Sequence, residues 1–292
     1  MLRALLKTMR PKQWTKNVFV FAALVFDHKL MQTDWVLRAV IGFGLLCLLS
    51  STVYLVNDLA DIEKDRQHPK KRRRPLAAGQ LTPAAALIAV GAFSLIALPL
   101  AFALHWQFGV IAGAYLFSNL LYSFWLKHVV LIDVLLVALG YLLRVSAGAV
   151  LVTSAISPWL YICMTLLALF IGFGKRRGEL VLMQADSSSS RRVLQDYSLA
   201  FLDELINLVA TATLVAYSFY TFSAANLPEN HAMMLTIPFV LYGVFRYLYL
   251  IHIKGEGGAP DELVLVDRPL QVTLVLWGLA TILVLYFNPP PA

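Results

Sequence analysis

A group of acidic side chains follows directly on a long apolar run in the stretch VYLVNDLADIEKDRQHPKKRRRP, residues 53–75. It holds Asn57, Asp58, Asp61 and Asp65, and at about 100° per residue the three carboxylates fall within an arc of about 60° if the helix continues through them. Carboxylates on one helical face repel one another unless a cation lies between them. Oxygen ligands of this kind suit Mg²⁺, which keeps several waters and bridges to substrate phosphates.

A dense basic segment comes next, with seven lysines and arginines among residues 64–74. A phosphorylated substrate bound beside the carboxylates would need such counter-charge. The plainer interpretation is a solvated helix end followed by a basic loop that fixes membrane topology. Because the carboxylates share a face where an apolar segment ends, the sequence favours a site.

A second cluster runs from Tyr122 to Gly148, YSFWLKHVVLIDVLLVALGYLLRVSAG. Lys127 is expected at a turn, Asp133 about one turn inside the next helix, and Arg144 on nearly the same face about 16 Å deeper. A charge at that depth is costly and must face the helix bundle. Arg144 therefore either serves function or pairs with a carboxylate or with backbone carbonyls, whereas for Lys127 and Asp133 function is favoured.

A third cluster is GFGKRRGE at 172–179, where we expect a helix to end in glycines before three cations and Glu179. Lys175 and Arg176 could bind phosphate, or they could flank a membrane span like Arg177. A fourth is RPKQWTKN at 10–17, in which Lys16 and Asn17 open the first apolar segment.

Several familiar motifs are absent from the sequence. It has no phosphate-cradling glycine loop, no HExxH and no GxSxG, and its six histidines are scattered without metal-ligand spacing. The two cysteines, Cys47 and Cys163, lie in apolar runs and indicate neither a disulfide framework nor a metal site.

The composition identifies the elements that must position these residues. Of 292 residues 59% are hydrophobic and only 14% charged, with a mean hydropathy of +0.71, which predicts an all-α polytopic membrane protein. In this setting the net charge of +7 favours lipid headgroups and phosphorylated substrates as partners and not nucleic acid. Nine segments are of spanning length: residues 14–30, 34–57, 84–104, 106–125, 129–152, 157–174, 197–223, 232–252 and 269–287.

The cations also predict the orientation. Most of the 24 lysines and arginines fall at the N-terminus or in loops after the even-numbered spans, which places those parts in the cytoplasm. The N-terminus is basic but lacks a signal-peptide core and cleavage site, so we expect it to be retained.

The motif Asn57-Asp58-x-x-Asp61-x-x-x-Asp65-Arg66, with nine expected spans, resembles the UbiA-type intramembrane prenyltransferase superfamily. The stretches RPKQWTKN, YLVNDLADIEKDRQHPKKRRRPLAAG, LKH, YLLRVSAGA and GKRRGEL are more similar to its polyprenyl-phosphate phosphoribosyltransferases, represented by the decaprenyl-phosphate enzyme of mycobacterial cell-wall synthesis. The resemblance implies one domain over residues 1–292, a helical bundle with a central cavity, in the bacterial inner membrane. A homo-oligomer is compatible with the sequence.

The resemblance implies transfer of 5-phosphoribosyl from 5-phosphoribosyl 1-diphosphate to a polyprenyl phosphate, with release of diphosphate, for a cell-envelope glycolipid precursor. Mg²⁺ on the diphosphate would be held by Asn57, Asp61 and Asp65, with Asp58 alongside. The other residues expected at the substrates are Lys16, Asn17, Arg66, Lys70, Arg74, Tyr122, Arg144, Lys175, Arg176 and Glu179.

Relatives with aromatic acceptors carry a second aspartate-rich motif, whereas the corresponding region here holds one carboxylate, Asp133, and Lys127. Fewer carboxylates suit a site that must seat a second anion such as a lipid monophosphate. We therefore expect Lys127 to bind that phosphate, with Asp133 positioning the lysine or the ribose hydroxyls.

Three alternatives stay open at this point. One is an aromatic-acceptor prenyltransferase that uses a polyprenyl diphosphate. Another is an anion transporter, although the charges gather at one membrane face without a matching set opposite. The third, a scaffold for lipid-pathway proteins, leaves the shared acidic face unexplained.

Overall fold

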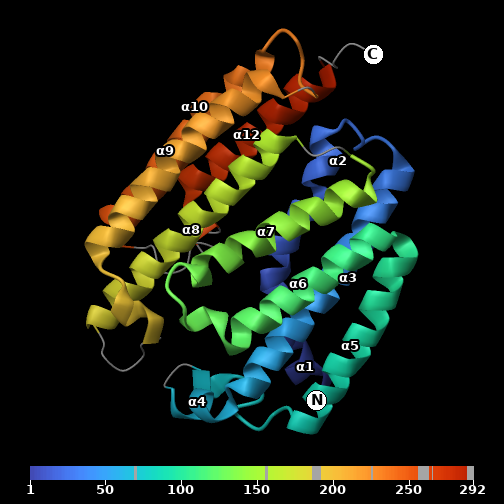
Figure 1. The fold of residues 1–292 in the computed structure, drawn as a ribbon, viewed down its shortest axis with the longest axis vertical. Coiled ribbons are helices and arrows are strands. Elements are labelled where there is room, and N and C mark those ends of the chain that lie inside the picture. The colour runs from blue at the N-terminus through green and yellow to red at the C-terminus, as the bar shows by residue number, and fades with distance from the viewer. Residues whose placement is uncertain are drawn as a thin grey trace. The chain divides into compact units, whose positions relative to one another are not determined.

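The computed structural model describes residues 1–68, 71–154, 157–185, 192–224, 226–255, 263–264 and 266–287. This part of the chain is built from helices without a strand (Figure 1), which confirms the all-α prediction. The chain divides into two compact units, and each is described by itself. The prediction of one domain around a central cavity stays a prediction.

The first unit comprises Met1–Leu24, Lys29–Leu126 and Leu143–Ala155. Its longest helix, α3, packs against α1, η1, α5 and α6, and α5 and α6 run side by side along it (Figure 1). The helices are α1 (Leu2–Met9), η1 (Pro11–Phe21), α3 (Thr33–Ala60), α4 (Ile62–Gln67), η2 (Lys71–Arg73), α5 (Pro83–Leu104), α6 (Trp106–Phe124) and the second half of α7 (Ile132–Leu151).

Side-chain chemistry explains where the elements of this unit begin. Thr82 caps α5 by accepting a hydrogen bond from Ala85 N, and Pro83 takes the first helical position, where its missing N–H costs nothing.

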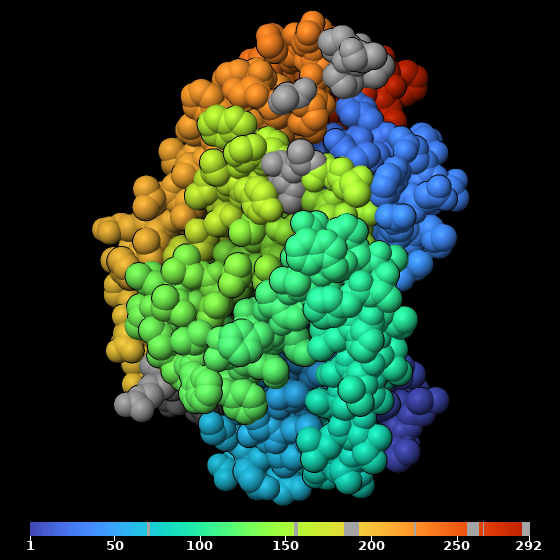
Figure 2. Space-filling view, turned by 45° about the vertical axis from the view of Figure 1, so that its right-hand side comes forward, coloured from blue at the N-terminus to red at the C-terminus, as the bar shows by residue number. Residues whose placement is uncertain are grey.

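A small cluster of Leu55, Leu76 and Leu81 holds the chain segment after η2 against α3. The space-filling view shows this segment and α4 beside the start of α5 (Figure 2).

A helix that the sequence did not predict, α1, precedes the first apolar segment. Its Leu2 and Leu6 are exposed next to Arg3 and Lys7 on the helical wheel, while Leu5 packs on the cluster of Leu55, Leu76 and Leu81. An apolar and basic outer face of this kind is typical of a helix that lies in the membrane interface.

The second unit comprises Val25–His28, Lys127–Leu142 and Ile156–Ala292. Within it α8 packs along α9, and α10 packs along α12. Its elements are the end of α2 (Ala22–Phe26), η3 (Leu126–His128), the first half of α7, α8 (Pro158–Ala185), η4 (Arg192–Asp196), α9 (Leu199–Ser223), η5 (Ala232–Thr236), α10 (Ile237–His252) and α12 (Arg268–Phe287).

The expectation that a helix ends at the glycines of GFGKRRGE is wrong, because α8 continues through them to Ala185. Both glycines lie at close helix contacts: a Cβ on Gly172 would lie 2.7 Å from a Val134 methyl carbon, and one on Gly174 would lie 2.7 Å from the Tyr247 hydroxyl. The glycines therefore serve packing rather than termination, and the cations that follow stand on a helix.

Seven of the described helices are long and apolar enough to cross a membrane, which confirms a multi-pass membrane protein. Two predicted spans differ: the first is an eleven-residue 3-10 helix that continues into five-residue α2, and α6 carries polar side chains such as Gln107 and Asn119. Nine crossings stay a prediction.

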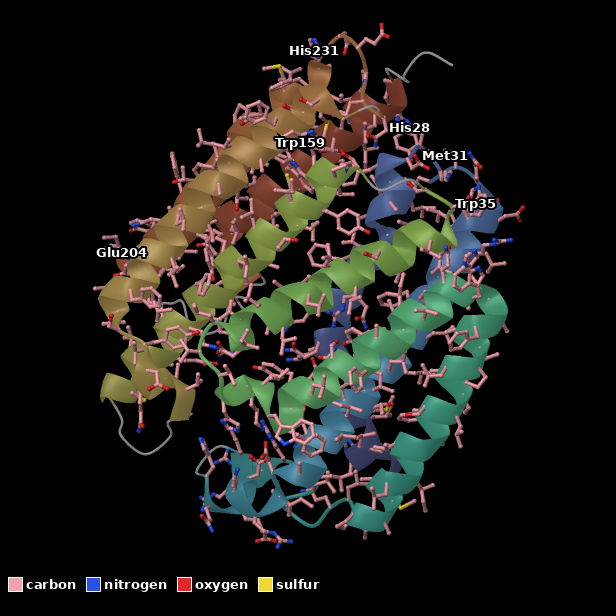
Figure 3. The ribbon with its side chains drawn as sticks, viewed as in Figure 1. His28, Met31, Trp35, Trp159, Glu204 and His231 are labelled. Atoms are coloured by element: carbon pink, nitrogen blue, oxygen red, sulfur yellow. The ribbon has the colours of Figure 1, made fainter. Side chains whose placement is uncertain are left out.

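Aromatic side chains lie at the beginnings of two spanning helices (Figure 3). Trp35 lies in the first turn of α3, with Lys29 5.3 Å and Arg38 5.0 Å from its ring centroid. Trp159 begins α8 and stacks on Phe219 with ring centroids 5.5 Å apart. Such residues anchor helix ends at the membrane interface.

Gly148 should be intolerant of even a methyl group. A Cβ there would lie 1.9 Å from Val20 O of η1, and neither backbone can yield without moving a helix. Since overpacking costs about 1–3 kcal/mol, Gly148→Ala should lower the unfolding temperature of the detergent-solubilised protein. Gly113→Ala is the matched control, because an added Cβ there would have no atom within 4 Å apart from the backbone of its own helix and its two chain neighbours. Equal unfolding temperatures for the two variants would contradict the close contact.

Candidate active site

The acidic motif spans the end of α3 and the short helix α4. Asp61 interrupts the helix with φ −104° and ψ 10°, but the register continues: Asp61 N donates to Asn57 O at 3.1 Å, and Asp65 N donates to Asp61 O at 2.8 Å. Asp58 and Asp65 consequently lie on the same side, since both contact one arginine nitrogen. The expectation of a shared acidic face is confirmed for these two carboxylates.

Two arginines neutralise this pair. Arg74 Nη1 donates to Asp58 Oδ1 at 3.1 Å and to Asp65 Oδ2 at 2.7 Å, and Arg10 Nη2 donates to Asp58 Oδ1 at 2.5 Å. Both carboxylates are buried. Pairing at such short range offsets the cost of removing these charges from water.

The donor set fits a divalent cation, with one difference from the prediction. The carboxylates of Asp58 and Asp65 both accept from one nitrogen of Arg74, so they already converge on one cation. Carboxylate oxygens are the ligands that Mg²⁺ prefers. Among the described residues, however, no three His, Cys, Asp or Glu side chains are placed to hold one metal ion. Asn57 and Asp61 are partly buried beside the pair, so the full set of ligands stays a prediction.

The sequence did not predict the part that Arg10 plays. This residue joins α1 to η1 with a left-handed φ of 54°, and its guanidinium carbon lies 4.8 Å from the centroid of the Tyr54 ring. The Arg-Pro pair in RPKQWTKN was the available signal, because a proline disfavours the α conformation in the residue before it, so that α1 ends at Arg10. Which carboxylate the Arg10 side chain would meet depends on tertiary packing.

A second polar cluster of the first unit is buried among apolar helices. Arg144 Nε donates to Asn17 Oδ1 at 2.8 Å, and its Nη2 donates to Tyr115 OH at 2.8 Å. Asn17 Nδ2 in turn donates to Ser50 Oγ and Cys47 Sγ at 3.3 Å. The structure thus joins two predicted site residues from distant stretches, Asn17 and Arg144. It also adds Tyr115, which sequence reasoning missed: its hydroxyl accepts from the guanidinium, and its ring centroid lies 4.7 Å from the guanidinium carbon.

In the second unit Asp133 is fully buried and uses both carboxylate oxygens. Oδ2 accepts from Arg176 Nε at 2.5 Å, and Oδ1 accepts from Tyr197 OH at 2.8 Å. Arg176 Nη1 also donates to Glu179 Oε2 at 2.5 Å. Burial raises the pKa of the Tyr197 phenol above its ordinary value, and donation to Asp133 adds to the shift. Asp133 therefore positions Arg176, and its expected role toward Lys127 stays a prediction.

Arg177, assigned no ligand role from the sequence, joins three helices of the second unit. Its Nε donates to Asp203 at 2.5 Å and its Nη1 donates to Ile251 O at 3.1 Å. These contacts account for the residue without a substrate.

For the other predicted site residues, the expected roles stay predictions. Arg66 is exposed and donates to Glu63 at 2.8 Å, a surface pair of small energetic weight. Lys70 lies outside the described residues. Lys16, Tyr122, Lys127 and Lys175 are partly buried.

Comparison with known proteins gives one consistent result. The profile of the UbiA prenyltransferase family matches residues 17–261. Decaprenyl-phosphate phosphoribosyltransferase of Corynebacterium glutamicum is 33% identical over 98% of this chain and 87% of its own. The protein of that name in Mycolicibacterium smegmatis is 32% identical over 95% and 91%. The structure of a UbiA homologue from Archaeoglobus fulgidus, bound to GPP and Mg²⁺, is 17% identical with a TM-score of 0.71 and covers 98% of both chains.

Removing the positive charge from Arg176 should destabilise the protein strongly. Arg176→Gln leaves the Asp133 carboxylate buried without its counter-ion, which costs about 3–5 kcal/mol, and thermal unfolding in detergent would report the loss. The double variant with Asp133→Asn should recover much of the stability, since no buried charge is then left. A double variant no more stable than the single one would contradict this account.

Proposed function

Because the chain belongs to the UbiA prenyltransferase family, we propose that it is a polyprenyl-phosphate phosphoribosyltransferase of the bacterial inner membrane. It transfers 5-phosphoribosyl from 5-phosphoribosyl 1-diphosphate to a decaprenyl-type phosphate and releases diphosphate. The observation that carries the proposal is the identity of 32–33% to two proteins of this name over at least 95% of the chain. The basic side chains around α4 suit the two anionic substrates, and the acidic ones suit a metal ion bound between them and a phosphate.

Asn57, Asp58, Asp61 and Asp65 would hold Mg²⁺, which when bound neutralises the negative charge that the diphosphate gains as the anomeric bond breaks. The solved relatives with Mg²⁺ are consistent with such an ion. Arg74, which donates to the carboxylates of Asp58 and Asp65, would bind a donor phosphate. Arg66 can leave its exposed partner Glu63 at little cost.

The remaining cations would bind phosphate groups of either substrate. Guanidinium groups match phosphate bidentately, whereas lysine acts as a compact charge. We assign Lys16, Lys70, Lys175 and Arg176 to the donor and Lys127 to the lipid phosphate. Arg144, oriented by Asn17 and Tyr115, supplies a buried positive charge for an anionic substrate group, and Glu179 orients Arg176.

The chemistry at the acceptor needs no general base. A phosphate monoester with a second pKa of about 6 is largely dianionic in the cytosol and is already a nucleophile. The protein must orient this phosphate toward the ribose and stabilise the leaving diphosphate. Preorganised positive charge contributes most at that step.

Asp65→Asn should abolish the transfer of label from phosphoribosyl-labelled donor to a polyprenyl phosphate in membranes. The change removes one carboxylate charge from the proposed metal set while keeping the side chain's size. Glu63→Gln is the matched control, because Glu63 is exposed on the same short helix and should retain wild-type turnover. Wild-type activity of Asp65→Asn would contradict the assignment. Label transfer from a polyprenyl diphosphate to an aromatic acceptor instead would favour that alternative reaction.

Removal of divalent cations should stop the reaction reversibly. Dialysis against EDTA is expected to eliminate transfer, and added Mg²⁺ should restore it, since the leaving diphosphate would otherwise carry uncompensated charge. The assay is release of diphosphate, with Ca²⁺ as a test of how strictly a small, octahedral ion is required. Turnover unaffected by chelation would count against the scheme.

A further inference from the structure

The arginines that neutralise Asp58 and Asp65 occupy the carboxylate oxygens that a metal ion would need. We propose that Arg10 and Arg74 are internal counter-ions that leave these carboxylates when a divalent cation binds, and that they then hold the phosphates of the donor. This inference rests on the proposed function. We call this step the arginine exchange. It adds Arg10 to the residues that meet the donor and gives Arg74 two successive partners.

Charge balance favours the exchange. The charges of the Asp58 and Asp65 carboxylates and of the two guanidinium groups cancel, which offsets the cost of burying these two carboxylates. A divalent cation carries the same charge as the two guanidinium groups and can replace them at these carboxylates without changing that balance. Both arginines are then available to an anion that arrives with the metal.

The exposure of the side chains shows which partner can move. The Asp58 and Asp65 side chains are 2% and 4% exposed, whereas those of Arg10 and Arg74 are 31% and 28% exposed. The arginines therefore approach the carboxylates from the solvent side. Their guanidinium groups can rotate away while the acidic side chains keep their packing.

The backbone on either side of the arginines is held in place, so the exchange needs no loop movement. Ala78 N donates to Arg74 O at 2.8 Å, and Leu76 is buried in a cluster with Leu55 of α3. Gln13 N donates to Arg10 O at 2.8 Å. Only the long side chains of the arginines have to change partner, and guanidinium groups bind phosphate as readily as carboxylate.

The test measures bare Mn²⁺ binding, without substrate, by paramagnetic resonance on the full-length protein in nanodiscs. Arg74→Gln removes the cation that competes for both carboxylates and should tighten Mn²⁺ binding about tenfold. The matched control is Arg73→Gln. Arg73 is the exposed last residue of η2, next to Arg74 in the chain, so this substitution removes the same charge without touching the carboxylates. Its affinity should stay at the wild-type value. Equal affinities for the two variants, or weaker binding by Arg74→Gln, would overturn the exchange.

A second measurement follows the arginines to the donor. In saturating Mn²⁺, Arg74→Gln and Arg10→Gln should each weaken binding of 5-phosphoribosyl 1-diphosphate about tenfold. The same substitution at Arg74 then raises the affinity for Mn²⁺ and lowers the affinity for the donor. Arg74→Lys keeps the charge but not the bridge between two carboxylates, and it should also tighten Mn²⁺. This variant provides the test if Arg74→Gln does not fold. Unchanged donor affinity in both glutamine variants would overturn the exchange.

The outcomes separate this inference from the proposed function. Mn²⁺ affinities as expected, but no phosphoribosyl transfer by the wild type, would overturn the function and leave the counter-ion role intact. Transfer with equal Mn²⁺ affinities would overturn the exchange alone. Absence of Mn²⁺ binding in the wild type and all variants would overturn the exchange and the proposed metal site together.

Discussion

The structure depends on neutralising charges that lie among apolar helices. A carboxylate in such surroundings is tolerated only with a close counter-ion and with its lone pairs satisfied. Asp58 meets Arg10 and Arg74, and Asp133 meets Arg176 and Tyr197. Arg144 donates to the oxygens of Asn17 and Tyr115, which orient its guanidinium. These contacts fix the position of each buried charge within its own unit.

The packing of each unit serves this constraint. In the first unit Gly148 lets η1 approach α7 closely, and that approach brings Asn17 of η1 to Arg144 of α7. In the second unit Gly172 lets α8 approach Val134, the neighbour of Asp133, whose carboxylate meets Arg176 of α8. In both places a glycine lies at a close contact with a neighbouring element, one helical turn from a buried arginine on the same helix.

Local chemistry made much of this predictable. The helical class, the shared side of Asp58 and Asp65, and the interior position of Arg144 follow from periodicity and from the cost of charge in an apolar span. The partners do not follow, because they depend on which helices meet. Arg10 reaches Asp58 across 48 positions of the chain, and Arg144 reaches Asn17 across 127. The continuation of α8 past its glycines was missed because glycine disfavours a helix locally, whereas contacts with Val134 and Tyr247 reward it at these two positions.

The length of α8 has a mechanical consequence. Its 28 residues extend about 42 Å, whereas a hydrocarbon core is about 30 Å thick, so one unbroken helix is long enough to span the core and to continue past it. The backbones of Lys175, Arg176 and Glu179 are therefore ordered by α8 itself, at fixed helical intervals, and not by a loop. The relative positions of their Cα atoms are set before any other molecule approaches.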